Sequence, residues 1–230
     1  MKAKITLLLL IPLLSSLCLA EDFSAYYPGA KGKTWNYKVS KQSIVTIGKE
    51  SSKQDKSGTM REEVIDVIDN SIAVIQRTVT EGSVTVQSTL HVRIEPAVIS
   101  IVAIGVGSAQ PIKLPVAQPL LLDQLPGASI DGSQGPMRMA SQLVSQMAAN
   151  VDVRAGSFAD CLLTESKGVV TGRLNNMSIK EGSIVVKSWY ARDVGMVRED
   201  RVLKLNVTTA EGADLVLEDA ASKTLDQYTK

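Results

Sequence analysis

The chain has 230 residues, and its 25 Lys and Arg side chains nearly balance its 24 Asp and Glu side chains. Nothing in this balance calls for nucleic acid or an anionic lipid as a partner, so no nucleic-acid partner is expected. The length suits one large β domain or two small ones, and it can bury a core without disulfides or metals.

The chain opens with a secretory leader. Lys2 and Lys4 give a basic start, an apolar run follows, and small and polar residues lead to Ala20. This order is typical of a signal peptide that is cleaved after Ala20. We therefore expect a signal peptide over residues 1–20 and a single β-rich domain over residues 21–230, located in the periplasm or secreted.

The two cysteines bear on the location of the mature chain. Cys18 lies two residues before the expected cleavage site, and Leu17 fits a lipoprotein signal poorly, because such signals prefer Gly or Ala just before the cysteine. Cleavage after Ala20 leaves Cys161 alone and excludes an intramolecular disulfide. Lipidation of Cys18 would instead anchor the protein to a membrane. No later stretch is long enough for an apolar membrane span of about 18 residues.

Alternating polar and apolar residues predict strands through most of the mature chain. Trp35, Tyr37 and Val39 mark the first half-buried strand, and the same alternation recurs over residues 84–94, 203–207 and 215–217. Turn signals separate the strands, and they predict antiparallel hairpins. These signals are Asp69-Asn70, Glu81-Gly82, Glu181-Gly182 and Glu211-Gly212.

Two segments resemble each other across the chain, residues 79–88 and residues 179–188, each with Glu-Gly-Ser near its start. An internal duplication is one explanation. We favour the other, in which both are ordinary hairpins with the same turn chemistry.

The middle of the chain is unusually poor in charge. Between Pro96 and Val151 only Lys113, Asp123, Asp131 and Arg138 are charged. Three prolines within residues 111–122 predict that this apolar stretch is irregular and covers a core, lines a ligand cavity or meets a partner. Residues 137–154 fit helix and strand spacing, and we interpret them as strand, at least from Ala149 onward.

Candidate catalytic groups are few. His91, the only histidine, falls on the polar side of its predicted strand, and Cys161 lies in an apolar run that is typical of a buried thiol. Metal sites need several ligands, and no such cluster, phosphate loop or nucleophile elbow occurs. We therefore expect no catalytic residues, no metal and no cofactor, and we do not expect an enzyme.

Seven of the nine aromatic residues lie in two places, five within residues 23–37 and two at Trp189-Tyr190. We expect these bulky side chains to meet in one cluster. The cluster either closes one end of the fold as core or forms an apolar ligand site. The core interpretation is favoured, because a core is needed in any case.

Three motifs resemble a group of poorly characterised exported bacterial β-rich proteins. They are Gly32-x-x-Trp35-x-Tyr37, Ala155-Gly-Ser-Phe158-Ala-Asp-Cys161, and the hairpin Trp189-Tyr190-Ala-Arg-Asp-Val194-Gly195-Met-Val197. The chain departs from the pattern at Asp193, where a glycine is usual. The resemblance implies a curved antiparallel sheet, similar in outline to the half-barrels of periplasmic lipoprotein carriers, and implies little about activity.

Together these features predict a mainly β fold: a single curved antiparallel sheet, a half-barrel or open barrel, with at most one or two helices. The first functional hypothesis is an envelope binding protein that holds an apolar ligand such as an acyl chain on the concave face. The second is an assembly module that binds another envelope protein through residues 97–125, and a hydrolase has the least support. The candidate ligand-binding residues are Trp35, Tyr37, Val98, Ile101, Ile104, Leu120, Leu122, Trp189 and Tyr190.

Overall fold

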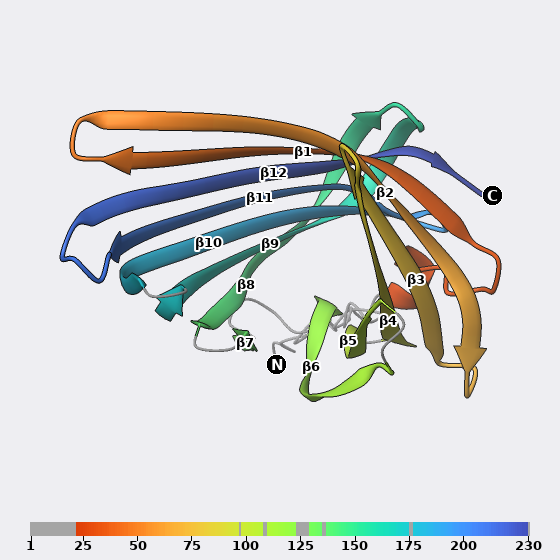
Figure 1. The fold of residues 1–230 in the computed structure, drawn as a ribbon. Coiled ribbons are helices and arrows are strands. Elements are labelled where there is room, and N and C mark those ends of the chain that lie inside the picture. The colour runs from red at the N-terminus through yellow and green to blue at the C-terminus, as the bar shows by residue number, and fades with distance from the viewer. Residues whose placement is uncertain are drawn as a thin grey trace, which may run out of the picture.

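The computed structural model describes residues 22–96, 98–107, 110–122, 129–134, 137–174 and 177–229. The leader with Cys18 lies outside the described residues, as do the side chains of residues 114–148. In the described part the chain is almost entirely β, and its one helix is the short 3-10 turn η1 (Phe23–Tyr26). The predicted fold class is therefore confirmed (Figure 1).

The strands are long for a globular domain. They are β1 (Thr34–Ile47), β2 (Glu50–Ile68), β3 (Ile72–Glu81), β4 (Val84–Glu95), β5 (Val98–Val106), β6 (Ile112–Leu122), β7 (Ser129–Gln134), β8 (Met137–Val153), β9 (Gly156–Leu174), β10 (Met177–Ala191), β11 (Gly195–Thr208) and β12 (Asp214–Tyr228). The interpretation of residues 137–153 as strand is confirmed by β8.

All described strands join one antiparallel sheet of twelve strands, in the order β6-β5-β4-β3-β2-β1-β12-β11-β10-β9-β8-β7. The sheet is thus two meanders of consecutive hairpins that meet where β1 pairs with β12. The low-charge middle of the chain supplies both edge strands, β6 and β7.

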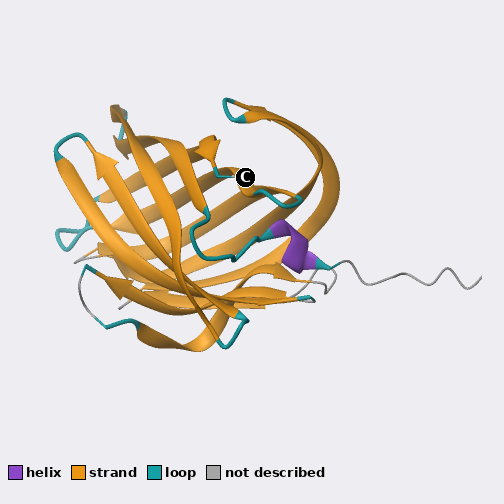
Figure 2. Cartoon of the chain, turned by 90° about the vertical axis from the view of Figure 1, so that its right-hand side faces the viewer, coloured by secondary structure: helices purple, strands orange, loops and turns teal. Residues whose placement is uncertain are grey.

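The two edges of the sheet lie near each other. Leu122 ends β6 and Ser129 begins β7, so the chain between them can span at most about 25 Å. Cα atoms of β6 and β7 come within 8 Å of one another. No ladder joins β6 to β7 in the described residues, so the sheet curls toward a barrel and stays open (Figure 2).

The segment with three prolines is a strand, which corrects the prediction that it is irregular. Its register slips twice against β5, and Pro119 faces Ser100 beside one of these irregularities. Proline has no N–H to donate to a neighbouring strand. An edge strand is paired on one side only, and proline is also tolerated where a bulge interrupts the pairing. The position of β6 at the edge of the sheet therefore makes the prolines compatible with a strand.

The predicted turn at Glu181-Gly182 was wrong, because both residues lie inside β10, where its register shifts against β9 and β11. Glycine is needed there for close approach: a Cβ on Gly182 would lie 2.6 Å from the carbonyl oxygen of Val170 and 2.8 Å from Leu205. Residues 79–88 do form a hairpin, between β3 and β4. The two similar segments are therefore not two hairpins.

One face of the sheet, here called the inner face, carries the core. Ile75 on β3, Ile99 on β5, Cys161 on β9 and Val197 on β11 belong to a single buried cluster although their strands are far apart in the sheet. Side chains so distributed can meet only on the inside of the curve. Phe23 of η1 joins them and is fully buried, so the N-terminal segment fills one end of the inner face (Figure 2).

Candidate ligand-binding face

The aromatic side chains close one end of the inner face. Phe23, Tyr26, Tyr27, Trp35, Tyr37 and Tyr190 are all buried in the main core cluster. The expectation that they meet is confirmed, and their burial favours the core interpretation, since little of their surface remains for a ligand. Burial raises the pKa of Tyr27, Tyr37 and Tyr190 well above the usual tyrosine range, so these phenols are neutral.

Two of the sequence motifs are joined by hydrogen bonds in this core. The indole Nε1 of Trp35 donates to the carbonyl oxygen of Val194 at 2.5 Å, and the hydroxyl of Tyr37 donates to the carbonyl oxygen of Met196 at 3.1 Å. Strand β1 is thereby fixed to the turn between β10 and β11. The motifs thus specify how the two meanders meet, which is an architectural role.

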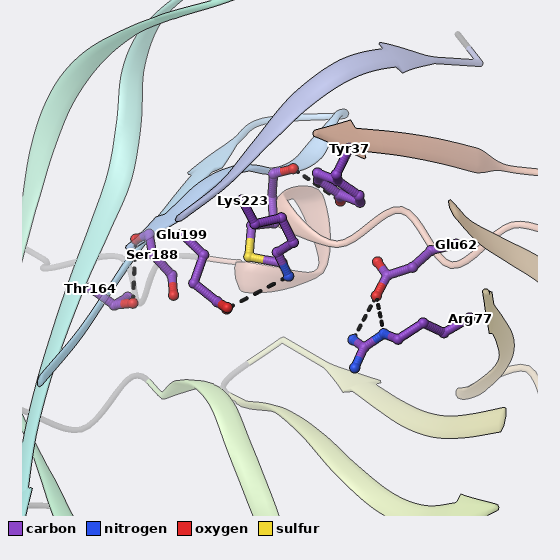
Figure 3. A network of polar contacts seen from close by, with 8 residues as sticks. Tyr37, Glu62, Arg77, Thr164, Ser188, Glu199 and Lys223 are labelled. Atoms are coloured by element: carbon purple, nitrogen blue, oxygen red, sulfur yellow. Dashed lines mark hydrogen bonds and ion pairs between the residues drawn. The ribbon is translucent and has the colours of Figure 1, made fainter. Parts of the chain in front are cut away.

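A band of charged side chains borders the aromatic core (Figure 3). Glu62 on β2 is only 3% exposed, and its Oε1 accepts hydrogen bonds from Nε and Nη2 of Arg77 on β3, at 2.8 and 2.6 Å. Burial raises the pKa of Glu62, but the neighbouring charges of Arg77 and Lys223 outweigh it, so the pKa lies below its usual value. Glu62 is therefore an ionised carboxylate inside the fold.

The band continues across the C-terminal meander. The register places Lys223 of β12 beside Glu199 of β11, and Glu199 beside Ser188 of β10. Lys223 is 9% exposed, and its Nζ lies 3.7 Å from a carboxylate oxygen of Glu199. Thr164 of β9 ends the described part of the row and donates to the carbonyl oxygen of Ser188. The charged band thus crosses the inner face from β9 to β12, and it includes Glu62 and Arg77 at its side.

Beyond the charged band, apolar side chains on the inner face are open to solvent. Val84 and Val86 on β4 are 61% and 49% exposed, and Val106 on β5 is 65% exposed. Their ladder partners place them on the inner face: Val86 faces Val79, which faces Met60 of the core. A depression of about 590 Å³ lies here, and it is lined by Lys56, Ser57, Val79, Glu81, Gly82, Val84 and Val86.

Strands β9, β10 and β11, on the other side of the sheet from β4 and β5, also carry apolar side chains. A second buried cluster contains Val170, Ile184, Leu205 and Val207, from β9, β10 and β11. Leu205 and Val207 lie on the inner face with Glu199, because β11 pairs with β12 without a register shift from Arg198 to Thr208. The inner face is therefore apolar at both ends and polar in the middle.

The structure distributes the predicted site residues over both faces. Trp35, Tyr37 and Tyr190 are core, and Ile101 and Ile104 pack against that core. Trp189 also packs against that core, and the guanidinium of Arg198 lies 5.0 Å from its ring centre. Val98 pairs with Glu95 on the convex side, and Leu122 of β6 lies opposite Val98. The side chains of Leu120 and Leu122 lie outside the described residues.

Sequence reasoning missed the residues that give the inner face its character, namely Glu62, Arg77, Val84, Val86 and Lys223. The alternation at Val84 and Val86 was visible, but their exposure was not. Nothing in the sequence separates Glu62 or Lys223 from the many charged residues around them, because their burial depends on the curvature of the sheet.

The candidate catalytic groups are isolated from one another. Cys161 is fully buried, its Sγ lies 3.6 Å from the carbonyl oxygen of Phe158, and burial raises the pKa of its thiol. His91 pairs with Val74 on the convex side of β4. Among the described residues, no three His, Cys, Asp or Glu side chains are arranged to hold a metal ion. In the described part of the chain, no helix is long and apolar enough to cross a membrane.

Comparison with known proteins gives structural neighbours only. No protein-family model and no curated protein matches the chain. A candidate lipoprotein from Parabacteroides distasonis is 13% identical with a TM-score of 0.49, and the match covers 89% of this chain and 98% of the neighbour. A candidate exported protein of YmcC-like fold from Bacteroides fragilis is 11% identical with a TM-score of 0.46, over 88% of this chain and 97% of the neighbour. Lipovitellin, in a structure that describes its lipid–protein interactions, is 12% identical with a TM-score of 0.30, over 87% of this chain and 26% of its own.

Proposed function

We propose that this protein is an exported, non-enzymatic binding protein of the cell envelope that holds an apolar molecule on its inner face. The observation that carries the proposal is the exposure of Val84, Val86 and Val106 beside the depression on that face. Apolar side chains left open on the concave side of a sheet mark a ligand-binding or partner-binding surface. The leader at residues 1–20 supports export.

The free energy gained by covering these valine side chains is consistent with a lipid-like ligand. Full burial of a valine side chain contributes about 1.5–3 kcal/mol, so covering the exposed half of each of these valines contributes about 1 kcal/mol apiece. The second apolar cluster, around Leu205, offers more surface on the opposite wall. An acyl chain, which is long, flexible and apolar, can contact both walls.

The test is uptake of a fluorescent fatty acid by the purified mature chain, together with native mass spectrometry of the protein as isolated. Val86→Asp places a charge on the inner face and should weaken uptake at least tenfold. Val202→Asp is the matched control, because Val202 is 51% exposed but pairs with Ala220 on the convex face. Uptake should be unchanged in this control.

Two results would contradict the proposal. One is equal loss of uptake in both variants, which would indicate general destabilisation. The other is no uptake and no co-purifying ligand in the unaltered protein. If, in that second case, crosslinking in cells found a protein partner that Val86→Asp abolished, the inner face would belong to an assembly module instead.

A further inference from the structure

Lys223 is a mostly buried cation that makes an ion pair, but no hydrogen bond, with the described residues. Its ammonium lies 3.7 Å from Glu199, too far for a hydrogen bond, and 5.2 Å from the ring centre of Tyr37. Among the described residues no acceptor lies within hydrogen-bond distance of its Nζ. An ammonium has three donors, and the Lys223 Nζ keeps enough contact with solvent for water or an added acceptor to reach them. The site is therefore suited to an added acceptor.

Arg77 offers further donors nearby. Nε and Nη2 both point at one oxygen of Glu62, which leaves Nη1 without a hydrogen bond among the described residues. The side chain of Arg77 is 29% exposed, whereas that of Glu62 is almost fully covered. Both Arg77 and Lys223 act electrostatically on the Glu62 carboxylate, so the two cations flank one buried anion. Figure 3 shows them pointing into the same region.

The open apolar strip begins directly beside Arg77. On β3 the inner-face residues after Arg77 are Val79 and Glu81, and their partners on β4 are Val86 and Val84. Successive inner-face positions along a strand are about 7 Å apart. A molecule with an acidic end at Arg77 and Lys223 therefore meets valine side chains as soon as its chain leaves the charged band.

We propose that Lys223 and Arg77 bind the acidic head group, a carboxylate or a phosphate, of an amphiphile whose chain covers Val79, Val84 and Val86. The inference rests on the proposed function and adds the chemistry of the head group. Planar acids suit the free edge of the Arg77 guanidinium, and Lys223 supplies a point charge to either acid. Glu199, whose side chain is one-third exposed, keeps access to water when a second anion enters.

The experiment compares three ligands with the same chain, hexadecanoic acid, hexadecyl phosphate and hexadecanol, by competition with a fluorescent probe. At least one acid should bind tenfold or more tightly than the alcohol, since charge-assisted hydrogen bonds are of that strength. Whichever acid binds more tightly identifies the head group. Lys223→Met should remove the preference and leave binding of the alcohol unchanged.

Lys41→Met is the control, because Lys41 also lies on the inner face but is already paired with Asp219 at 3.0 Å. It removes the same charge and should keep the preference for the acid. If Lys223→Met does not fold, as judged by circular dichroism, Lys223→Gln serves in its place. Equal affinity for acid and alcohol, or an equal loss of all three ligands in Lys223→Met, would overturn the inference and leave the proposed function intact. Failure of all three ligands to bind the unaltered protein would overturn both.

Discussion

Replacing Arg77 by methionine should destabilise the protein strongly and in a manner that depends on pH. The substitution removes both hydrogen bonds to Glu62 and leaves a carboxylate that is 3% exposed. Removing one partner of a buried ion pair costs about 3–5 kcal/mol, because the remaining charge is uncompensated. Lys223 still attracts Glu62, so we expect the lower end of this range at pH 7.

The pH dependence follows from the pKa of Glu62. In the unaltered protein this pKa lies below its ordinary value of 4.5, so the pair stabilises the fold above pH 4.5 and the contribution is lost as the pH falls through the lowered pKa. Without Arg77, burial dominates and should raise the pKa of Glu62 above 4.5. The variant is then more stable when the buried Glu62 carboxyl group is protonated. The difference in unfolding free energy between the two proteins should therefore shrink as the pH falls toward 4.

Urea unfolding followed by tryptophan fluorescence, at pH 7 and at pH 4, measures this difference. The control is Arg61→Met, which breaks an exposed pair with Glu63 on the other face of the same strand. That change should cost less than about 1 kcal/mol at either pH. The double variant Glu62→Leu, Arg77→Met should recover most of the loss, because no buried charge remains. A difference for Arg77→Met that is below about 1 kcal/mol, or is the same at both pH values, would refute this reasoning.

Three further predictions concern the core and its turns. Trp35→Phe should lower the free energy of unfolding by about 1–3 kcal/mol, because the buried carbonyl of Val194 loses its donor. Chemical denaturation measures this, and an unchanged unfolding midpoint would contradict it. Asp193→Gly should raise stability by up to about 1 kcal/mol, since Asp193 has a φ of 62°, where glycine is unstrained; a lower melting temperature would count against this account. The Cys161 thiol should not react with a thiol reagent at pH 8 until the protein unfolds, because burial raises its pKa, and fast labelling of the folded protein would show that it is accessible.

The sequence was sufficient to predict the fold class, because alternation of period two is a local signal. Strand β1 and the late strands β11 and β12 could be predicted from it, and so could the assignment of β8 as strand. Turns were less predictable, because the role of a glycine depends on the residues of the neighbouring strand. Glu181-Gly182 has the composition of a turn, but its glycine is required by the backbone of Val170 in the adjacent strand.

The edges of the sheet were the least predictable part. Prolines in residues 111–122 argue against a central strand, and they say nothing about a strand that needs only one partner. Whether a strand is central or at the edge depends on the order in which strands associate, which is a property of the whole chain. In this protein the first and last strands pair, so the middle of the sequence forms both edges. No local pattern carries that information.

The position of the charged band follows from the same topology. Glu62 and Arg77 come from the N-terminal meander, Glu199 and Lys223 from the C-terminal one, and they approach each other only because β1 joins β12 and the sheet curves. A buried ion pair is seldom the most stable solution, since apolar residues of similar size often serve as well or better. The closed core on one side of the band and the second apolar cluster on the other show that this sheet accommodates apolar side chains along the inner face. Charged residues at this boundary therefore fit our proposal that Lys223 and Arg77 bind the acidic head group of a ligand.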